Sequence, residues 1–442
     1  MKDVLQTNKK YAIMRVLYIF EAAFEYFFTL AVGSVYLAKL TAYMGISDKV
    51  TGILTAFVSL GCGFQMLAIF MAKRRNKKRL ILFGSLLNQF LFIFLYFIPI
   101  LRMSRRTKTA LFIVMLLVAH IIRNAINSPK INWYMSFVPL KQRGRFTAKK
   151  EIVSLVSGML VTYALGSLMD HYETIGDIRT AFIICGCCLT ALMFLYSGIL
   201  LATEKPQEDI EKQKFSVKGL FREKDLIKIV LLFTLWNIAS YATTSFMGTY
   251  QTKELGFSTA FASIIIAITS LIRAIFSQPM GKLADKRSFR NMLIVCFAIE
   301  LLAFGVSIFT APSNGKVLYP IYSGLYCLGM AGINSGMLNL MYDYVKVENR
   351  TGAYALIQTV SGIAGFLITL LFSPLVEYIQ KNGNQIFGLP LYAQQVLSIF
   401  SFLVVAVILL YMYFGFKNSK KNTETENVIA ERTDGELSQN VS

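Results

Sequence analysis

Long apolar stretches, repeated along almost the whole chain, constrain the fold more than any other feature. About twelve of them are each long enough to cross a bilayer, which takes roughly 20 mostly apolar residues. Of the 442 residues, 55% are hydrophobic and 16% are charged, which is more apolar surface than one soluble core can bury. We therefore expect an all-α integral membrane protein whose first stretch is a spanning helix rather than a cleaved leader. The stretches are centred near residues 25, 59, 91, 121, 160, 191, 239, 269, 300, 331, 366 and 403.

The placement of the basic residues explains the formal net charge of +20. The termini and loops expected on one side of the membrane hold 31 Lys and Arg residues, whereas the loops opposite hold 10. This is the positive-inside pattern. It predicts a multi-pass protein of the inner or plasma membrane with both termini in the cytoplasm, in contact with anionic lipid headgroups and not with nucleic acid. The basic segment of residues 102–108 departs from the pattern, and nothing in the sequence accounts for it.

The two halves of the chain resemble each other after a shift of about 210 residues. Arg143 and its neighbouring Val, Ala, Ser and Gly residues match Arg350 and its neighbours, and Gly45-Ile-Ser matches Gly256-Phe-Ser. We expect two pseudo-symmetric six-helix bundles. Their residues are 1–203 and 229–416, with a cytoplasmic linker over 204–228 and a disordered cytoplasmic tail over 417–442.

One loop motif connects this architecture to a known family. From Gly281 the chain reads Gly-Lys-Leu-Ala-Asp-Lys-Arg-Ser-Phe-Arg, which resembles the G-x-L-a-D-r-x-G-r-r signature of the major facilitator superfamily. The matching stretch after the second expected helix keeps its basic run but has Arg74 in place of the aspartate. The resemblance covers the whole chain. It implies a gate on the cytoplasmic side with Asp285 as its latch. The alternative is that the loop is merely a basic turn with an aspartate that caps a helix. The gate residues are Gly281, Asp285, Arg287, Arg143 and Arg350.

Polar side chains at helical spacing mark a candidate binding site. They lie on the expected helices near residues 25, 121, 239 and 331, which are the four that line the cavity in this family. The expected helices near 91, 191 and 403 have no charged residue in their cores, as lipid-facing helices require. The predicted substrate and proton site comprises Glu21, Glu25, Arg123, Asn124, Asn127, Asn237, Tyr241, Thr244, Tyr322, Tyr326 and Asn334.

Glu25 and Arg123 are the most informative pair, because a charge at this depth costs several kcal/mol unless it is paired or hydrated. We expect Glu25, with Glu21 one turn away, to bind the coupling proton or a cationic group of the substrate. Arg123 would neutralise it or hold an anionic or hydroxyl-bearing substrate. The alternative is a purely structural ion pair. Arg273 and Glu300 lie at similar depth and are expected to pair within the second half as a structural contact.

Several function classes are disfavoured by what the sequence lacks. We find no nucleophile with a base and no phosphate-binding loop, so we expect no enzyme and no cofactor. The cysteines lie inside apolar stretches and the chain has only two histidines, which argues against a metal site. Two unequal halves favour a carrier over a channel. We expect a monomeric secondary active transporter of a small-molecule substrate, coupled to H+ or another cation. A polar solute such as a sugar or nucleoside is favoured, and an exporter of lipophilic cations is the alternative.

Overall fold

The computed structural model describes residues 2–65, 77–135, 137–138, 143–204, 224–345, 350–386 and 388–416. The first half contains α1 (Lys2–Ala31), α2 (Ser34–Tyr43), α3 (Asp48–Thr55), α4 (Phe57–Gly63), α6 (Lys77–Phe97), η1 (Ile98–Ile100), α7 (Arg105–Met135), α8 (Arg143–Ile175) and α9 (Ile178–Ala202). The second half contains α11 (Lys224–Thr244), α12 (Met247–Thr249), the π-helix η3 (Tyr250–Glu254), α13 (Thr259–Lys286), α14 (Phe289–Ile308), α15 (Gly315–Tyr344), α16 (Arg350–Lys381), β1 (Gln385–Ile386), β2 (Leu389–Pro390) and α17 (Ala393–Gly415).

The described helices account for the expected membrane crossings. Nine are long and apolar enough to span a bilayer, and a tenth span results if α1 and α2, bent by 43° relative to each other, are taken together. The helix α15 and the α3–α4 segment coincide with two further expected stretches, so about twelve expected helices have a counterpart among the described elements. The fold is therefore the all-α membrane fold that the apolar stretches predict. Most of the expected linker and the whole expected tail, residues 205–223 and 417–442, lie outside the described residues.

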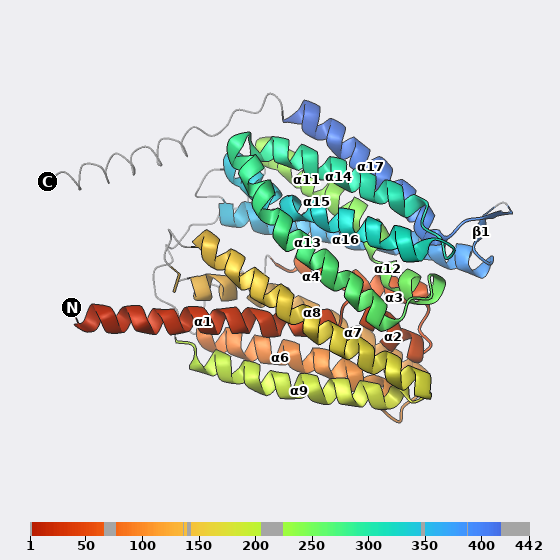
Figure 1. Cartoon of the computed structure of the whole chain (residues 1–442), viewed down its shortest axis with the longest axis horizontal. Coiled ribbons are helices and arrows are strands. Elements are labelled where there is room, and N and C mark those ends of the chain that lie inside the picture. Colours follow the sequence, from red (N-terminus) through yellow and green to blue (C-terminus); the bar gives the residue numbers. More distant parts are fainter. Residues whose placement is uncertain are drawn as a thin grey trace.

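The two halves form two helix bundles that lie against each other, α1 to α9 in one and α11 to α17 in the other (Figure 1). Each bundle has its own apolar core. The first is built around Phe92, Phe112 and Phe182, and the second around Phe297 and Phe304, all fully buried. The second core is closed mainly by the packing of α14 on α15 and of α11 on α16 and α17. Each half is thus packed around a core of its own.

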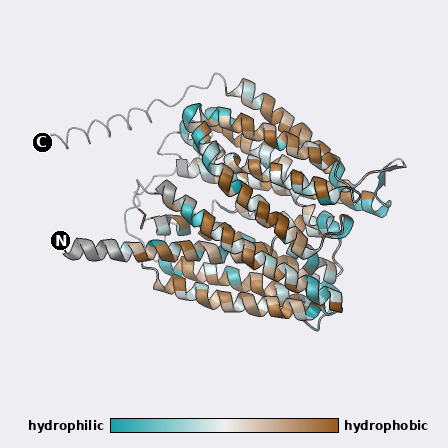
Figure 2. Ribbon diagram, viewed as in Figure 1, coloured by the Kyte–Doolittle hydropathy of each residue, from teal (hydrophilic) through white to brown (hydrophobic). Residues whose placement is uncertain are grey.

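Large apolar side chains cover the outside of both bundles. Leu160, Phe194 and Leu371 are 71%, 69% and 70% exposed, respectively. Figure 2 shows apolar residues along the length of the helices and polar residues gathered at their ends. Such a surface would aggregate in water and suits a hydrocarbon environment. The outer faces therefore indicate a bilayer around the middle of the molecule.

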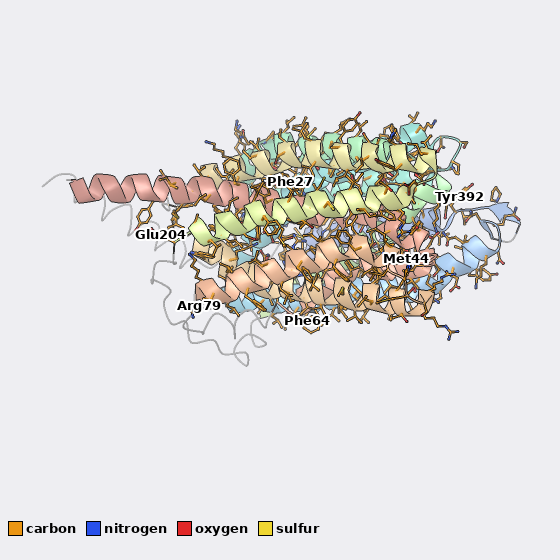
Figure 3. The ribbon with its side chains drawn as sticks, turned by 90° about the horizontal axis from the view of Figure 1, so that it is seen from below. Phe27, Met44, Phe64, Arg79, Glu204 and Tyr392 are labelled. Atoms are coloured by element: carbon orange, nitrogen blue, oxygen red, sulfur yellow. The ribbon has the colours of Figure 1, made fainter. Side chains whose placement is uncertain are left out.

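The molecule has two distinct ends. At one, called here the terminal end, α1 begins and α17 ends (Figure 1). Arg79 and Glu204 lie toward this end, and Met44 and Tyr392 lie toward the opposite one, the far end (Figure 3). Helix contacts between the halves join α8 to α13, α3 and α4 to α16, and α2 to α12. These contacts bring the halves together from the middle of the molecule to the far end.

Two features at the far end were not foreseen from the sequence. A short antiparallel hairpin, β1 with β2, precedes α17. The basic segment 102–108 also has a structural role, because Arg105 donates a hydrogen bond to the carbonyl oxygen of Gly45, just after the end of α2, and Lys108 Nζ donates to Pro99 O at 2.8 Å. A cation at a helix C-terminus is stabilised by unpaired carbonyls and by the helix dipole. Local capping thus accounts for two of the four basic residues in this segment, Arg105 and Lys108.

Candidate functional site

Four charged side chains of α1 and α7 meet inside the first bundle. Lys130 Nζ lies 3.1 Å from Glu21 Oε1 and forms a second ion pair with Glu25. Arg123 Nε lies 3.8 Å from Glu25 Oε1. The Lys130 and Glu21 side chains are 3% and 1% exposed, whereas those of Arg123 and Glu25 are 26% and 19% exposed. The cluster therefore has a buried part, Glu21 with Lys130, and an accessible part, Glu25 with Arg123.

Helical spacing explains why these charges converge. Glu21 and Glu25 are four residues apart on α1, and Arg123 and Lys130 are seven apart on α7, so each pair lies on one face of its helix. Pro129 lies inside α7 directly before Lys130 and removes one backbone hydrogen bond of that helix. The sequence analysis found Glu21, Glu25 and Arg123 but missed Lys130. The spacing of two turns from Arg123 was the signal that would have identified it.

Tyrosines and a further lysine enclose the cluster. Tyr196 on α9 donates a hydrogen bond to Glu21 Oε1 at 3.0 Å. The ring of Tyr18 stacks on that of Tyr134 with centroids 4.4 Å apart, and Lys150 Nζ lies 4.9 Å from the Tyr18 ring centroid. Lys150 belongs to α8, so four helices of the first bundle contribute to the cluster. When all are ionised, the carboxylates of Glu21 and Glu25 lie among three cations, and the site carries one excess positive charge. The cations are Arg123, Lys130 and Lys150.

The remaining predicted residues of α7 are less central. Asn124 Nδ2 donates to His120 O at 3.0 Å, and Asn124 Oδ1 accepts from Cys62 Sγ at 3.4 Å. The contact with Cys62 connects α7 to α4, whereas the one with His120 lies within α7. Asn127 is half-buried one turn further along α7.

The second half contributes an aromatic and hydroxyl group of residues. Tyr326 OH and Ser240 Oγ are 2.8 Å apart, and the Tyr326 ring stacks on Trp236 with centroids 6.3 Å apart. Tyr322 is buried next to Tyr326, with ring centroids 6.0 Å apart. The sequence analysis predicted both tyrosines and missed Ser240. Asn334, which it also predicted, is exposed further along α15.

The predicted residues of α11 have local partners. Asn237 Nδ2 donates to Phe233 O at 3.0 Å, and Thr244 Oγ1 donates to Ser240 O at 2.9 Å, so both side chains bond to their own helix. A Cβ added at Gly365 of α16 would lie 2.8 Å from the Tyr241 ring and 2.5 Å from Ser59 Oγ of the first half, so Tyr241 packs beside a residue of the other half. The structure therefore places Tyr241 at the interface between the halves.

The predicted pairing of Arg273 with Glu300 is wrong. Arg273 Nη2 lies 3.5 Å from Glu151 Oε1, across the boundary between the halves. Glu300 is fully buried between α14 and α15, and neither of its oxygens has a hydrogen-bond partner within the described part of the chain. Similar depth in the membrane did not suffice for pairing, because the two side chains lie on helix faces that point to different neighbours.

The predicted gate is only partly visible. Gly281 is exposed near the end of α13, and Arg287 is exposed directly after it. The side chains of Asp285, Arg143 and Arg350 lie outside the described residues. The latch therefore stays a prediction.

Ionic and hydrogen-bonded contacts join the halves at the far end. Lys49 Nζ lies 2.9 Å from Glu377 Oε2, and Lys253 pairs with Asp48. Gln380 Nε2 donates to Asp48 Oδ2 at 3.2 Å. Each contact links a residue of the first half to one of the second.

Two further contacts join the halves between that end and the centre. Both oxygens of Asp170 on α8 accept hydrogen bonds from the first backbone N–H groups of α13, at 2.8 Å from Thr259 and 2.7 Å from Ala260. Tyr36 OH and Ser263 Oγ are 3.0 Å apart. A carboxylate at a helix N-terminus satisfies unpaired donors and interacts favourably with the helix dipole. The far side of the molecule is thus closed in this conformation.

The described residues contain no group of three or more His, Cys, Asp or Glu side chains arranged to hold a metal ion. The chemistry available at the site is ion pairing, proton exchange and hydrogen bonding to a polar ligand.

Comparisons with known proteins agree that the chain resembles membrane transporters. The family model described as Major Facilitator Superfamily matches residues 18–369. The α-ketoglutarate permease of Escherichia coli (strain K12) is 26% identical over 202 residues, which cover 44% of this chain and 46% of that protein. The match therefore spans about half the length of that relative.

Solved structures share the fold. The crystal structure of a nucleoside transporter, NupG, is similar with a TM-score of 0.71 at 12% identity, covering 91% of this chain and 100% of that one. That of a D-xylose-proton symporter is similar with a TM-score of 0.69 at 14% identity, covering 92% and 98%. At these identities the likeness concerns the fold alone.

Proposed function

The chain belongs to the Major Facilitator Superfamily, and from this premise we propose that it is a secondary active transporter that moves a small organic solute by alternating access. The observation that carries the proposal is the acid–base cluster of Glu21, Glu25, Arg123 and Lys130. Intramembrane charges are costly and are characteristic of substrate and ion pathways. Their partial exposure at Glu25 and Arg123 makes the accessible part of the cluster available to a ligand.

Glu25 is the proposed site of coupling to a proton. In this conformation Lys130 and Arg123 both attract its carboxylate. Protonation of Glu25 would remove one negative charge from the cluster, so that Arg123 loses its partner and becomes available to a solute. Deprotonation would restore the pair and release the solute. Binding of proton and solute would thus favour each other, which is the requirement for symport.

The charge balance supports a polar solute with an anionic or hydroxyl group. The two carboxylates are already engaged by cations, and Lys150 adds a further positive charge. A lipophilic cation would meet excess positive charge there, so export of such compounds is the less favoured alternative. The permease relative, whose name specifies α-ketoglutarate, transports a solute of the anionic kind. Sugars and nucleosides remain in the proposal because the tyrosines and amides offer hydrogen bonds to hydroxyl groups.

We place the terminal end in the cytoplasm, on the basis of the distribution of Lys and Arg. The contacts of Asp48, Lys49 and Asp170 would then close the external side, and the conformation would be one that faces inward.

The test is a thermal-shift screen of purified protein against sugars, nucleosides, carboxylates and lipophilic cations, followed by transport of the stabilising solute into proteoliposomes. We expect the Glu25→Gln variant to lose accumulation driven by a pH gradient while it still inserts and binds the solute. Glu173→Gln, which affects an ion pair with Lys39 at the surface, is the matched control and should transport normally. Undiminished accumulation by Glu25→Gln would exclude Glu25 from coupling. Stabilisation by lipophilic cations alone would favour the exporter.

A further inference from the structure

Glu300 is a buried carboxyl that neither the predicted site nor the gate uses. It lies in α14, whose core is otherwise apolar, and its side chain is 0% exposed. Within the described part of the chain, neither Oε1 nor Oε2 has a hydrogen-bond partner. The cation expected to pair with it, Arg273, is directed to Glu151 instead. An acidic group in this position requires an explanation.

The carboxyl of Glu300 is packed against α15, and its described neighbours are uncharged. Gly329 of α15 lies so close that an added Cβ would overlap Oε1 of Glu300. The titratable groups near enough to interact with the carboxyl are Cys296 on its own helix and Tyr322, Tyr326 and Cys327 on α15. None of these groups carries a charge at neutral pH. Among the described residues, a metal cation or a solute ammonium group would therefore meet one carboxyl and no second anionic ligand here.

Burial without a counter-ion determines the protonation of this carboxyl. Moving an isolated carboxylate into an apolar interior is far more costly than protonating it, so the group takes up a proton instead. Glu21 is buried to a similar extent but has Lys130 and Tyr196 as partners. Glu21 is therefore stabilised as a carboxylate by an ion pair, whereas Glu300 is stabilised as a neutral acid.

Tyr326 is one of the side chains close enough to Glu300 to interact with its charge, although the two form no hydrogen bond in this conformation. Tyr326 precedes Gly329 by three residues on α15, so the two share a face of that helix. The Tyr326 hydroxyl lies 2.8 Å from Ser240 Oγ on α11. The next residue of α11, Tyr241, lies at the interface between the halves. This arrangement connects the region of the buried acid with a helix that reaches the interface between the halves.

We propose that Glu300 is a proton-binding site of the second half, occupied in this conformation and able to exchange its proton by way of Tyr326 and Ser240. Release requires a conformation in which the Tyr326 hydroxyl comes within hydrogen-bond distance of the carboxyl, because the two are not hydrogen-bonded here. The carboxyl O–H bond then breaks and its proton passes to the Tyr326 oxygen. The phenol proton passes to Ser240 and then to water, so each oxygen gains one proton and loses one, and no oxidation occurs. The inference rests on the proposed function, because it makes the proton a transported ion. It adds a second site to the one proposed at Glu25.

Infrared spectroscopy of the purified full-length protein tests whether the proton is present. A buried neutral carboxyl gives a C=O stretching band distinct from that of carboxylates. We expect this band in the wild type at neutral pH, its loss in Glu300→Gln, and its retention in the control Glu151→Gln. Absence of the band from the wild type, or its persistence in Glu300→Gln, would overturn the proposal. Absence of the band from the wild type overturns the proposal even if Glu300→Gln fails to fold.

Hydrogen–deuterium exchange of the same band tests the pathway. We expect Tyr326→Phe to keep the band but to slow its deuterium shift at least tenfold, because the first acceptor of the proton is lost. Tyr319→Phe, which removes a hydroxyl from the same helix, is the control and should exchange at the wild-type rate. Equal rates in wild type and Tyr326→Phe would refute the pathway.

Transport separates this inference from the proposed function. If the wild type transports a solute, Glu300→Gln should retain solute counterflow and lose at least half of the accumulation that a pH gradient drives. Wild-type accumulation in that variant would overturn a coupling role for Glu300. If the wild type transports nothing, the proposed function fails, whereas the infrared band still reports on the proton at Glu300.

Discussion

Replacement of Lys130 by Met would test the most deeply buried ion pair. The substitution keeps the length and apolar stem of the side chain but removes its charge, and leaves Glu21 at 1% exposure without a cation. Removing one partner of a buried ion pair costs about 3–5 kcal/mol. By contrast, the Arg123–Glu25 pair is long at 3.8 Å and partly exposed. Loss of such a pair by Arg123→Met should cost about 0.2–1 kcal/mol. The structure thus predicts a several-fold difference in cost between two substitutions in one cluster.

The pH dependence of the Lys130→Met variant follows from linkage. Without its cation, Glu21 would take up a proton in the folded protein, whereas an unfolded chain loses that proton above about pH 4.3. The folded state then binds more protons than the unfolded state, so stability falls as pH rises. We expect the destabilisation to be larger at pH 8 than at pH 5. The double variant Lys130→Met/Glu21→Gln should recover much of the loss, because it no longer buries an unpaired carboxyl.

The assay is thermal unfolding of detergent-purified variants, compared at one scan rate because unfolding of such proteins is often irreversible. The apparent Tm should be highest in the wild type, lower in Arg123→Met and lowest in Lys130→Met. If Lys130→Met is no less stable than Arg123→Met at pH 8, or if Glu21→Gln does not rescue it, the assignment of Lys130 to a buried pair with Glu21 is refuted.

Two further predictions concern contacts between the halves. Asp170→Asn should weaken the cap on α13 by about 1 kcal/mol and increase access to the interface from the far side. Access can be measured by the labelling rate of a cysteine introduced on the far side. Unchanged labelling would contradict a role of Asp170 in closure. Gly362→Ala would place a Cβ 2.6 Å from Ser59 O and should destabilise the closed state by about 1–3 kcal/mol. Gly198→Ala is the control, because its added Cβ would have no atom within 4 Å, and it should unfold like the wild type. Equal apparent Tm values for these two glycine variants would contradict the close backbone approach.

Much of the fold was predictable because its signals are local. The length of each apolar stretch reports on the bilayer, and the spacing of polar residues reports on the face of one helix, so the helices and the two halves followed from the sequence. The hairpin of β1 and β2 did not, since strands of two residues have no periodicity to detect. The cap that Arg105 forms on the carbonyl of Gly45 also escaped, because it joins segments 60 residues apart in the chain.

The candidate site shows the same division. The sequence by itself determined that Glu21, Glu25 and Arg123 are charges at membrane depth and that they need partners. The tertiary structure decided which partners they have: it brought Lys130 between the two acids, directed Arg273 to Glu151 and left Glu300 without a counter-ion. The physical reason is that a side chain's depth follows from its own helix. Its neighbours depend on how distant helices rotate and pack against that helix, and no local pattern of residues encodes this.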